Sequence, residues 1–173
     1  MKEDARGLER IEEDGGGWCG ACHPFQVRER EIERKKKEMS LQVGKYVMYA
    51  LGEENAPELD RAIGGRVSPV VQPEDGGTVL PYVWYYSTGM QEESTKDGYS
   101  GDVCQVEVEV VARNYREMIR LLQLVRQAME RAWETWEGEP TIMEQSFSAG
   151  PEEYDDSIQA YCRKMTYNIE THD

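Results

Sequence analysis

Residues 102–136, DVCQVEVEVVARNYREMIRLLQLVRQAMERAWETW, contain the clearest strand and helix patterns of the chain. The first part of this stretch, residues 102–111, alternates between apolar and polar side chains. One face would hold Cys104, Val106, Val108 and Val110, and the other Gln105, Glu107 and Glu109. A period of two residues predicts a half-buried β-strand whose polar face lies in water.

The second part of this stretch predicts a long amphipathic helix. Asn114 is a favourable N-cap, and Glu117 three residues later completes a pattern like a capping box. Apolar side chains then recur every three or four residues, at Tyr115, Met118, Leu122, Val125, Met129, Ala132 and Trp136. Such a stripe needs a sheet to pack on, so strand and helix together indicate an α+β domain.

The flanking sequence supplies shorter elements of both kinds. Ser40 is a candidate N-cap, Gly64 and Gly65 can end a helix, and Pro69 favours an edge strand. We predict helices over 41–51 and 57–63, strands over 66–71, 79–87, 141–148 and 158–171, turns over 72–78 and 149–156, and either a long loop or an extended hairpin over 88–101. The expected fold is α+β, with a four- to five-stranded antiparallel or mixed sheet and helices packed on one face.

Charge divides the 173-residue chain into two parts. Residues 1–38 hold 9 basic and 10 acidic side chains, so residues 39–173 account for −13 of the net charge of −14. We predict a flexible charged extension over 1–38 and one domain over 39–173, with Met39 as a candidate natural start. The acidic balance argues against a binder of nucleic acid or anionic membranes. The sequence contains no run of 18 apolar residues, so no membrane span is predicted.

The motif WCGACH, residues 18–23, resembles three kinds of site. Cys19, Cys22 and His23 could attach a c-type haem, form a thioredoxin-like thiol pair or contribute to a zinc site. The preceding residues form neither a buried strand nor a signal peptide, and structural zinc normally needs a fourth ligand. We therefore interpret the motif as incidental, predict no cofactor or metal, and keep a thiol redox or haem- or metal-binding protein as an alternative function.

Other candidate groups also have simple structural interpretations. Cys104 and Cys162 fall in predicted strands, where buried cysteines behave as small hydrophobes. Glu107 and Glu109 would lie about 6.5–7 Å apart at the backbone, and paired carboxylates can transfer protons. No histidine or nucleophile is near them in the sequence, so we interpret them as a solvated or interface face. Without a recognisable catalytic motif, we predict that the protein is not an enzyme.

Several weak motifs from Met39 onward occur in an informative order. Gly65-Arg66-Val67-Ser68-Pro69 precedes Leu80-Pro81-Tyr82-Val83, and Lys96-Asp97-Gly98 leads into the alternating strand. A helix that begins with Tyr115 and a last strand that runs from Tyr161 to Ile169 complete the series. In this order the chain resembles the tail-completion, or head–tail joining, proteins of long-tailed phages and prophages.

The resemblance implies a structural role without catalytic residues. Such proteins cap the finished tail tube and present it to the head connector, generally as a ring and commonly of six subunits. It implies a homo-oligomeric ring, contacts with the tail tube and head connector proteins, passage of genome DNA without specific binding, assembly in the host cytoplasm and a final place in the virion. A cytosolic α+β binding module is the remaining alternative.

The expected contact residues come from three places. Loop 88–101 is long for a connection and would serve as a contact arm through Lys96, Asp97 and Gly98. Glu107 and Glu109 would contribute from the polar strand face. Tyr85 would contribute from the aromatic strand 79–87, because aromatic residues are enriched in cores and at subunit interfaces.

Overall fold

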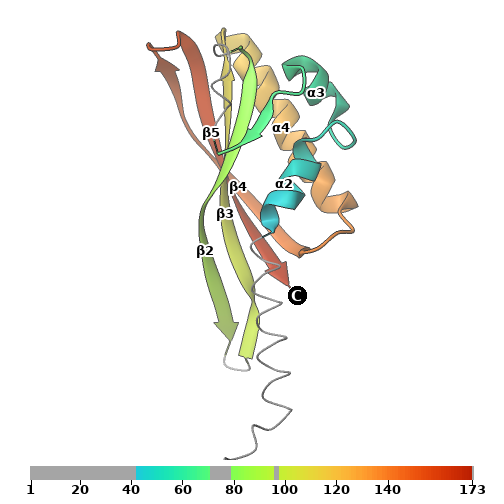
Figure 1. Cartoon of the computed structure of the whole chain (residues 1–173). Helices are drawn as coiled ribbons and strands as arrows, with labels where there is room; N and C mark the ends of the chain where they lie inside the picture. Colours follow the sequence, from blue (N-terminus) through green and yellow to red (C-terminus); the bar gives the residue numbers. More distant parts are fainter. Residues whose placement is uncertain (1–41, 71–78, 96–97, 173) are drawn as a thin grey trace, which may run out of the picture.

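The computed structural model describes residues 42–70, 79–95 and 98–172, and these form three helices and five strands. The helices are α2 (Val43–Leu51), α3 (Pro57–Ile63) and α4 (Tyr115–Thr135). The strands are β1 (Val67–Pro69), β2 (Tyr82–Thr95), β3 (Gly98–Ala112), β4 (Thr141–Asp155) and β5 (Ala160–His172). Figure 1 shows the sheet on one side and the helices on the other, as α+β folds require.

The sheet is mixed and has the strand order β1-β2-β3-β5-β4. The short strand β1 runs parallel to β2, and every other neighbouring pair is antiparallel. Pro69 lies in β1 at the edge of the sheet, where its missing N–H group breaks no ladder. The predicted fold class is therefore confirmed, with five strands in the sheet.

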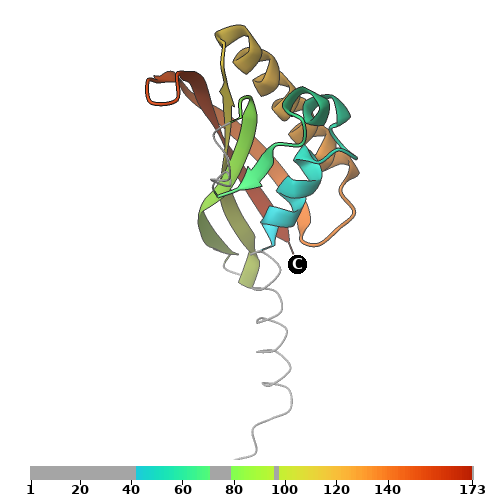
Figure 2. The ribbon, with the colours of Figure 1, turned by 45° about the horizontal axis from the view of Figure 1, so that its top comes forward.

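One face of the sheet carries the main core, and we call it the inner face. Val106, Val108 and Val110 of β3 point into it, together with Met165 and Tyr167 of β5. The apolar stripe of α4 covers these strands, and α2 and α3 pack beside α4 rather than on the opposite face. The turned view in Figure 2 shows the same one-sided arrangement.

Helix α4 begins as the sequence predicts. The side-chain oxygen of Asn114 accepts a hydrogen bond of 2.9 Å from the backbone N–H of Glu117. In a capping box, the Glu117 carboxylate would accept from the Asn114 backbone N–H. Here it accepts from the Asn114 side-chain amide instead, at 3.3 Å. The predicted helix at 57–63 is also confirmed, and it ends at Gly64 in the left-handed conformation with φ of 61°.

Helix α2 starts later than predicted. Its N-cap position is held by Gln42, whose side chain makes no capping hydrogen bond, and Ser40 lies outside the described residues. Val43, Val47 and Leu51 still form the buried stripe expected from the helical spacing. The N-cap preference of serine therefore gave the wrong start for helix α2, although the helix itself was predicted.

The prediction of an acidic turn over 149–156 is wrong, because β4 continues to Asp155. A register irregularity between Ala149 and Glu152 accommodates Gly150 and Pro151 within the strand. Pro151 is tolerated there because β4 is an edge strand. Tyr154 then packs against Tyr161 of β5, with ring centroids 4.9 Å apart, and the turn follows over 156–159.

Of the two alternatives for residues 88–101, the extended hairpin is correct and the loop is wrong. Strands β2 and β3 stay paired as far as Thr95 and Gly98. Figure 1 shows this hairpin and the β4–β5 hairpin reaching toward opposite ends of the molecule. Lys96 and Asp97 lie outside the described residues, as do the cysteine motif at 18–23 and the predicted turn at 72–78.

Candidate functional site

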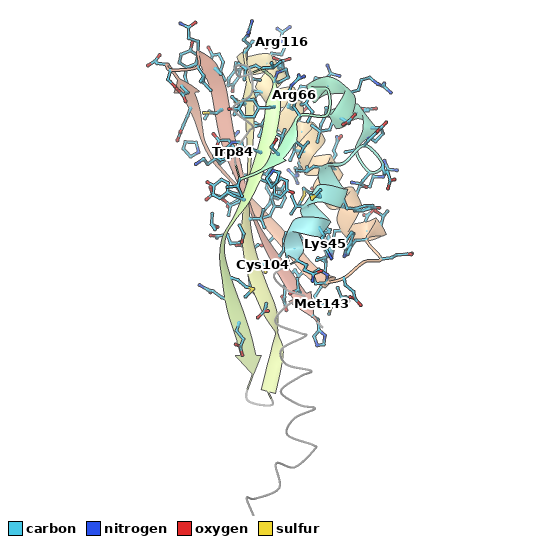
Figure 3. All side chains as sticks on the ribbon, viewed as in Figure 1. Lys45, Arg66, Trp84, Cys104, Arg116 and Met143 are labelled. Atoms are coloured by element: carbon cyan, nitrogen blue, oxygen red, sulfur yellow. The ribbon has the colours of Figure 1, made fainter. Side chains whose placement is uncertain are left out.

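The face of the sheet away from the helices, which we call the outer face, carries a connected set of polar and aromatic side chains. Register places Glu109 of β3 beside Lys164 of β5, and Trp84 of β2 on the other side of Glu109. One step along the strands, Glu107 lies beside Tyr86 in the same way. Figure 3 labels Trp84 on the side of the ribbon opposite the helices.

Lys164 lies at the centre of this set. Its Nζ is 3.9 Å from Oε2 of Glu107 and 3.9 Å from Oε2 of Glu109. It also donates to the hydroxyl of Tyr86 at 3.4 Å, and that hydroxyl donates in turn to the Glu107 carboxylate. The rings of Trp84 and Tyr86 are 5.2 Å apart and tilted. We call these five residues the outer-face network.

The two carboxylates of the network differ in burial. Glu109 is only 8% exposed, and burial raises its pKa, while Lys164 opposes that rise. Trp84 lies near enough to favour the ionised form of Glu109, although its buried indole nitrogen makes no hydrogen bond of normal geometry with a described residue. The hydrogen bond with Tyr86 raises the pKa of Lys164, so the ammonium stays charged between the carboxylates.

The prediction that the polar face of β3 lies in water is wrong at Glu109, which is buried, and the outer face beyond it is apolar. Val111, Ala160 and Cys162 are buried there in a second, smaller apolar cluster. Leu80, Tyr82, Trp84 and Ile158 pack around it. Cross-strand packing of large side chains near the β4–β5 turn excludes water locally, which an alternating pattern alone does not reveal.

On the other side of the network, the outer face is polar as predicted. The Thr88 hydroxyl bonds to the side-chain oxygen of Gln105 at 2.9 Å, and the Gln105 amide donates to Asn168 at 3.2 Å. These bonds link β2, β3 and β5 across the face. The side chains are therefore held in fixed positions, which suits a surface for specific contact.

The structure brings together only some of the residues predicted to make contacts. Glu107 and Glu109 lie side by side in the outer-face network. Tyr85 is 5% exposed and points into the inner core, so its role in this structure is packing. Gly98 pairs with Thr95 at the start of β3, whereas Lys96 and Asp97 are outside the described residues.

Sequence reasoning missed Lys164, Trp84 and Tyr86. Successive residues of a strand point to opposite faces of the sheet. The sequence of β2 therefore indicates that Trp84 and Tyr86 share a face, and that of β5 indicates that Lys164 lies opposite Met165. The register between strands decides that Lys164 meets Glu109, and no local pattern contains that information.

The cysteines that the structure describes lie in apolar surroundings. Cys104 is buried in the main core, where burial raises the pKa of its thiol to about 11. Cys162 is buried in the outer apolar cluster, and burial also raises the pKa of its thiol. Both are core residues as predicted, in surroundings that disfavour a reactive thiolate.

Two further findings concern only the described part of the chain. It holds no group of three or more His, Cys, Asp or Glu side chains arranged to bind a metal ion. None of its helices is long and apolar enough to cross a membrane.

Comparison with known proteins gives a match to a family model and matches to solved structures. The family model described as tail completion protein gp17 matches residues 54–169. A solved chain from a structure titled "Virion of native gene transfer agent (GTA) particle" matches with a TM-score of 0.50 and 14% identity, covering 66% of this chain and 84% of that chain. At this identity the likeness shows a shared fold. No curated protein matches the chain.

Proposed function

The chain belongs to the tail completion protein gp17 family, and on that premise we propose that it closes the finished tail tube and joins it to the head connector as a ring. The family makes it a structural tail protein with its place in the virion, and this suggests a non-enzymatic role. The ring, its partners and assembly in the host cytoplasm are the proposed part.

The observation that carries the proposal is the outer-face network. A ring that closes needs two different surfaces on each subunit, one for each neighbour. The described helices all cover the inner face, which leaves the opposite face of a long sheet open. That face presents aromatic residues and charges already fixed by mutual contacts, so it suits the wall of the lumen, while the edges of the sheet remain for the two neighbours.

Charge on the outer face suits the lining of a DNA passage. Glu107 and Glu109 share Lys164, and further along the sheet Glu144 is paired with Glu170 in register. These four carboxylates outnumber Lys164, the one lysine that the structure places among them. A lumen of this kind would repel phosphate groups, so genome DNA would pass without specific binding.

The end of the β2–β3 hairpin is the proposed contact arm toward the tail tube or a neighbouring subunit. Strand β5 pairs with β3 only as far as Asp102, so β3 from Gly98 to Gly101 extends beyond this partner. Gly98 pairs with Thr95 at this end of the hairpin, and Lys96 and Asp97 stand between these two residues in the sequence. A ribbon held on one side only can reach a partner without disturbing the core.

Light scattering coupled to size-exclusion chromatography tests the ring. We expect a species whose mass is a fixed multiple of the 19.9 kDa chain, commonly six in this family. A chain that stays monomeric at every concentration, and also in the presence of purified tail tubes, would count against the ring.

Deletion of residues 90–99 tests the arm. We expect a folded subunit together with loss of tail joining, because the core contact known to be lost is that of Met90, which is only partly buried at the margin of the main core. Normal numbers of infectious particles from the deletion would contradict the role of the arm, and far-ultraviolet circular dichroism would control for folding.

A further inference from the structure

The sheet has two open edges, on opposite sides. Strand β4 is one edge over its whole length, since among the described strands only β5 pairs with it. Strand β2 is covered by β1 only at Val83 to Tyr85, and the last bond there runs from the Val70 N–H to the Tyr85 carbonyl. From Tyr86 to Thr95, the edge of β2 that points away from β3 has no partner strand in the described chain.

The open parts of the two edges lie level with each other across the sheet. Register connects Tyr86 through Glu107 and Thr166 to Ser148. Two rows further on, it connects Gly89 through Gln105 and Asn168 to Ser146. A rotation about an axis along the strands, without a large shift along that axis, therefore brings β4 of one copy beside β2 of the next.

The stretches of the two edges that lie level with each other lack the usual protection against pairing. Residues 85–91, YYSTGMQ, and residues 145–150, QSFSAG, contain no charged residue and no proline, although charged residues make up 31% of the chain. Proteins that must avoid edge pairing normally place lysine or proline at such positions. The bulged residue Thr88 directs its hydroxyl to Gln105 of β3, so its side chain is engaged within the subunit.

The strand directions also agree. Strand β2 is antiparallel to β3, β3 to β5, and β5 to β4, so β2 and β4 run in opposite directions. Rotation about an axis along the strands preserves direction. Neighbouring subunits would therefore meet as an antiparallel pair, the arrangement in which strands pair most readily.

We propose that β4 of each subunit pairs with the open half of β2 in the next copy, so that one continuous sheet runs around the ring. This rests on the ring proposed above and specifies its interface. In this joint between β4 of one copy and β2 of the next, the outer faces of both copies would lie on the same side of the sheet. Ser146 would lie near Gly89 of the next copy, and Phe147 near its Ser87. Backbone hydrogen bonds then supply the contact, so an acidic subunit can bind copies of itself without pairing opposite charges.

Engineered cysteines test this joint directly. Gly89→Cys and Ser146→Cys are combined in a chain that also carries Cys19→Ser and Cys22→Ser. A Cβ atom at Gly89 meets nothing within 4 Å, so the change is sterically tolerated. After oxidation, or treatment with a short bismaleimide, we expect a ladder of covalent multimers that ends at the ring mass. Each chain that carries only one of the two engineered cysteines, with Cys104 and Cys162 still present, should stay monomeric on a denaturing gel.

Two results would overturn the joint. Covalent dimers from Ser146→Cys alone would show that β4 meets β4 across a twofold axis. Rings of normal mass that give no covalent ladder in the double variant would show that the subunits meet elsewhere, while leaving the ring intact. A wild-type chain that never forms rings would instead contradict the proposed function itself, so the two failures are distinguishable.

A charge placed on the edge gives an independent measurement. We expect Ser146→Lys to raise the concentration for half-assembly at least tenfold, because lysine on an edge strand opposes pairing. The matched control is Gln127→Lys, which adds the same charge on an exposed part of α4 and should leave assembly unchanged. Equal assembly of the two variants would contradict the joint, and equal melting temperatures would confirm that both fold.

Discussion

The two faces of one sheet use the same strands in different ways. On the inner face, Val106, Val108 and Met165 are buried under α4 and contribute by packing. On the outer face, their immediate neighbours Glu107 and Lys164 are held by hydrogen bonds and charge. The comparison teaches that packing on one face stabilises the subunit, while the other face can be specialised for contact. Four substitution experiments test this division between the faces, in order of decreasing expected change.

The largest contrast is expected between adjacent residues of β5. Met165→Ala on the inner face should lower the free energy of unfolding by about 2–5 kcal/mol, because Met165 is 2% exposed and its loss leaves a cavity. Thr166→Ala on the outer face should cost less than about 1 kcal/mol, the span of strand propensities. Urea denaturation measures both, and equal losses would contradict the division of roles.

The helix that covers the inner face depends on its first turn. Asn114→Ala should cost about 1 kcal/mol, because the hydrogen bond to the Glu117 N–H is lost. Asn114→Ser is the matched control, since a serine hydroxyl can still cap the helix. Thermal unfolding of both variants would show whether the cap or merely the change of side chain matters.

On the outer face we expect a dependence on pH rather than a large loss. Burial raises the pKa of Glu109, so the folded state holds this proton more tightly than the unfolded state. The contribution of Glu109 to stability therefore falls as pH rises from the ordinary glutamate range through the raised pKa. Glu109→Gln should remove that fall and be at least as stable as the wild type at pH 7. Urea denaturation at pH 4 and pH 7 measures the difference, and a variant that loses stability only at pH 7 would reverse the sign.

The smallest effect is expected for an ion pair on the exposed side of α4. Arg126 and Glu130 are 2.8 Å apart, with side chains 54% and 53% exposed. Solvent screens such pairs, so Glu130→Gln should cost no more than about 0.3–0.5 kcal/mol. The difference from wild type should vanish in 1 M salt, whereas a persistent difference would point to a contribution other than charge.

Local patterns predicted the elements well where one period dominates. Strand β3 and helix α4 follow from residues 102–136, and α3 agrees with its predicted bounds. Prediction was wrong where turn-forming residues carry less weight than pairing. Gly150 and Pro151 suggested a turn, but a bulge in an edge strand accommodates both. For residues 88–101 the sequence left a long loop and an extended hairpin open, and pairing of β2 with β3 through most of them selects the hairpin.

The candidate site was only half predictable for a related reason. The alternation in β3 placed Glu107 and Glu109 on one face, but it also suggested that both would lie in water. Glu109 is buried because Trp84 and the outer apolar cluster lie beside it, and apart from Val111 these residues come from outside β3. Tyr85 was predicted as a contact residue for its chemistry, and its parity on β2 directs it into the core instead.

The sequence by itself determined the α+β class, the main strand and helix, the acidity of residues 39–173 and the family resemblance that the comparisons confirm. These properties depend on residues near one another in the chain or on composition. Only the tertiary structure shows that Lys164 lies between two glutamates, and that uncharged stretches of two open edges lie level across the sheet. Those facts depend on strand register and order, which are fixed by packing across many residues rather than by any local period.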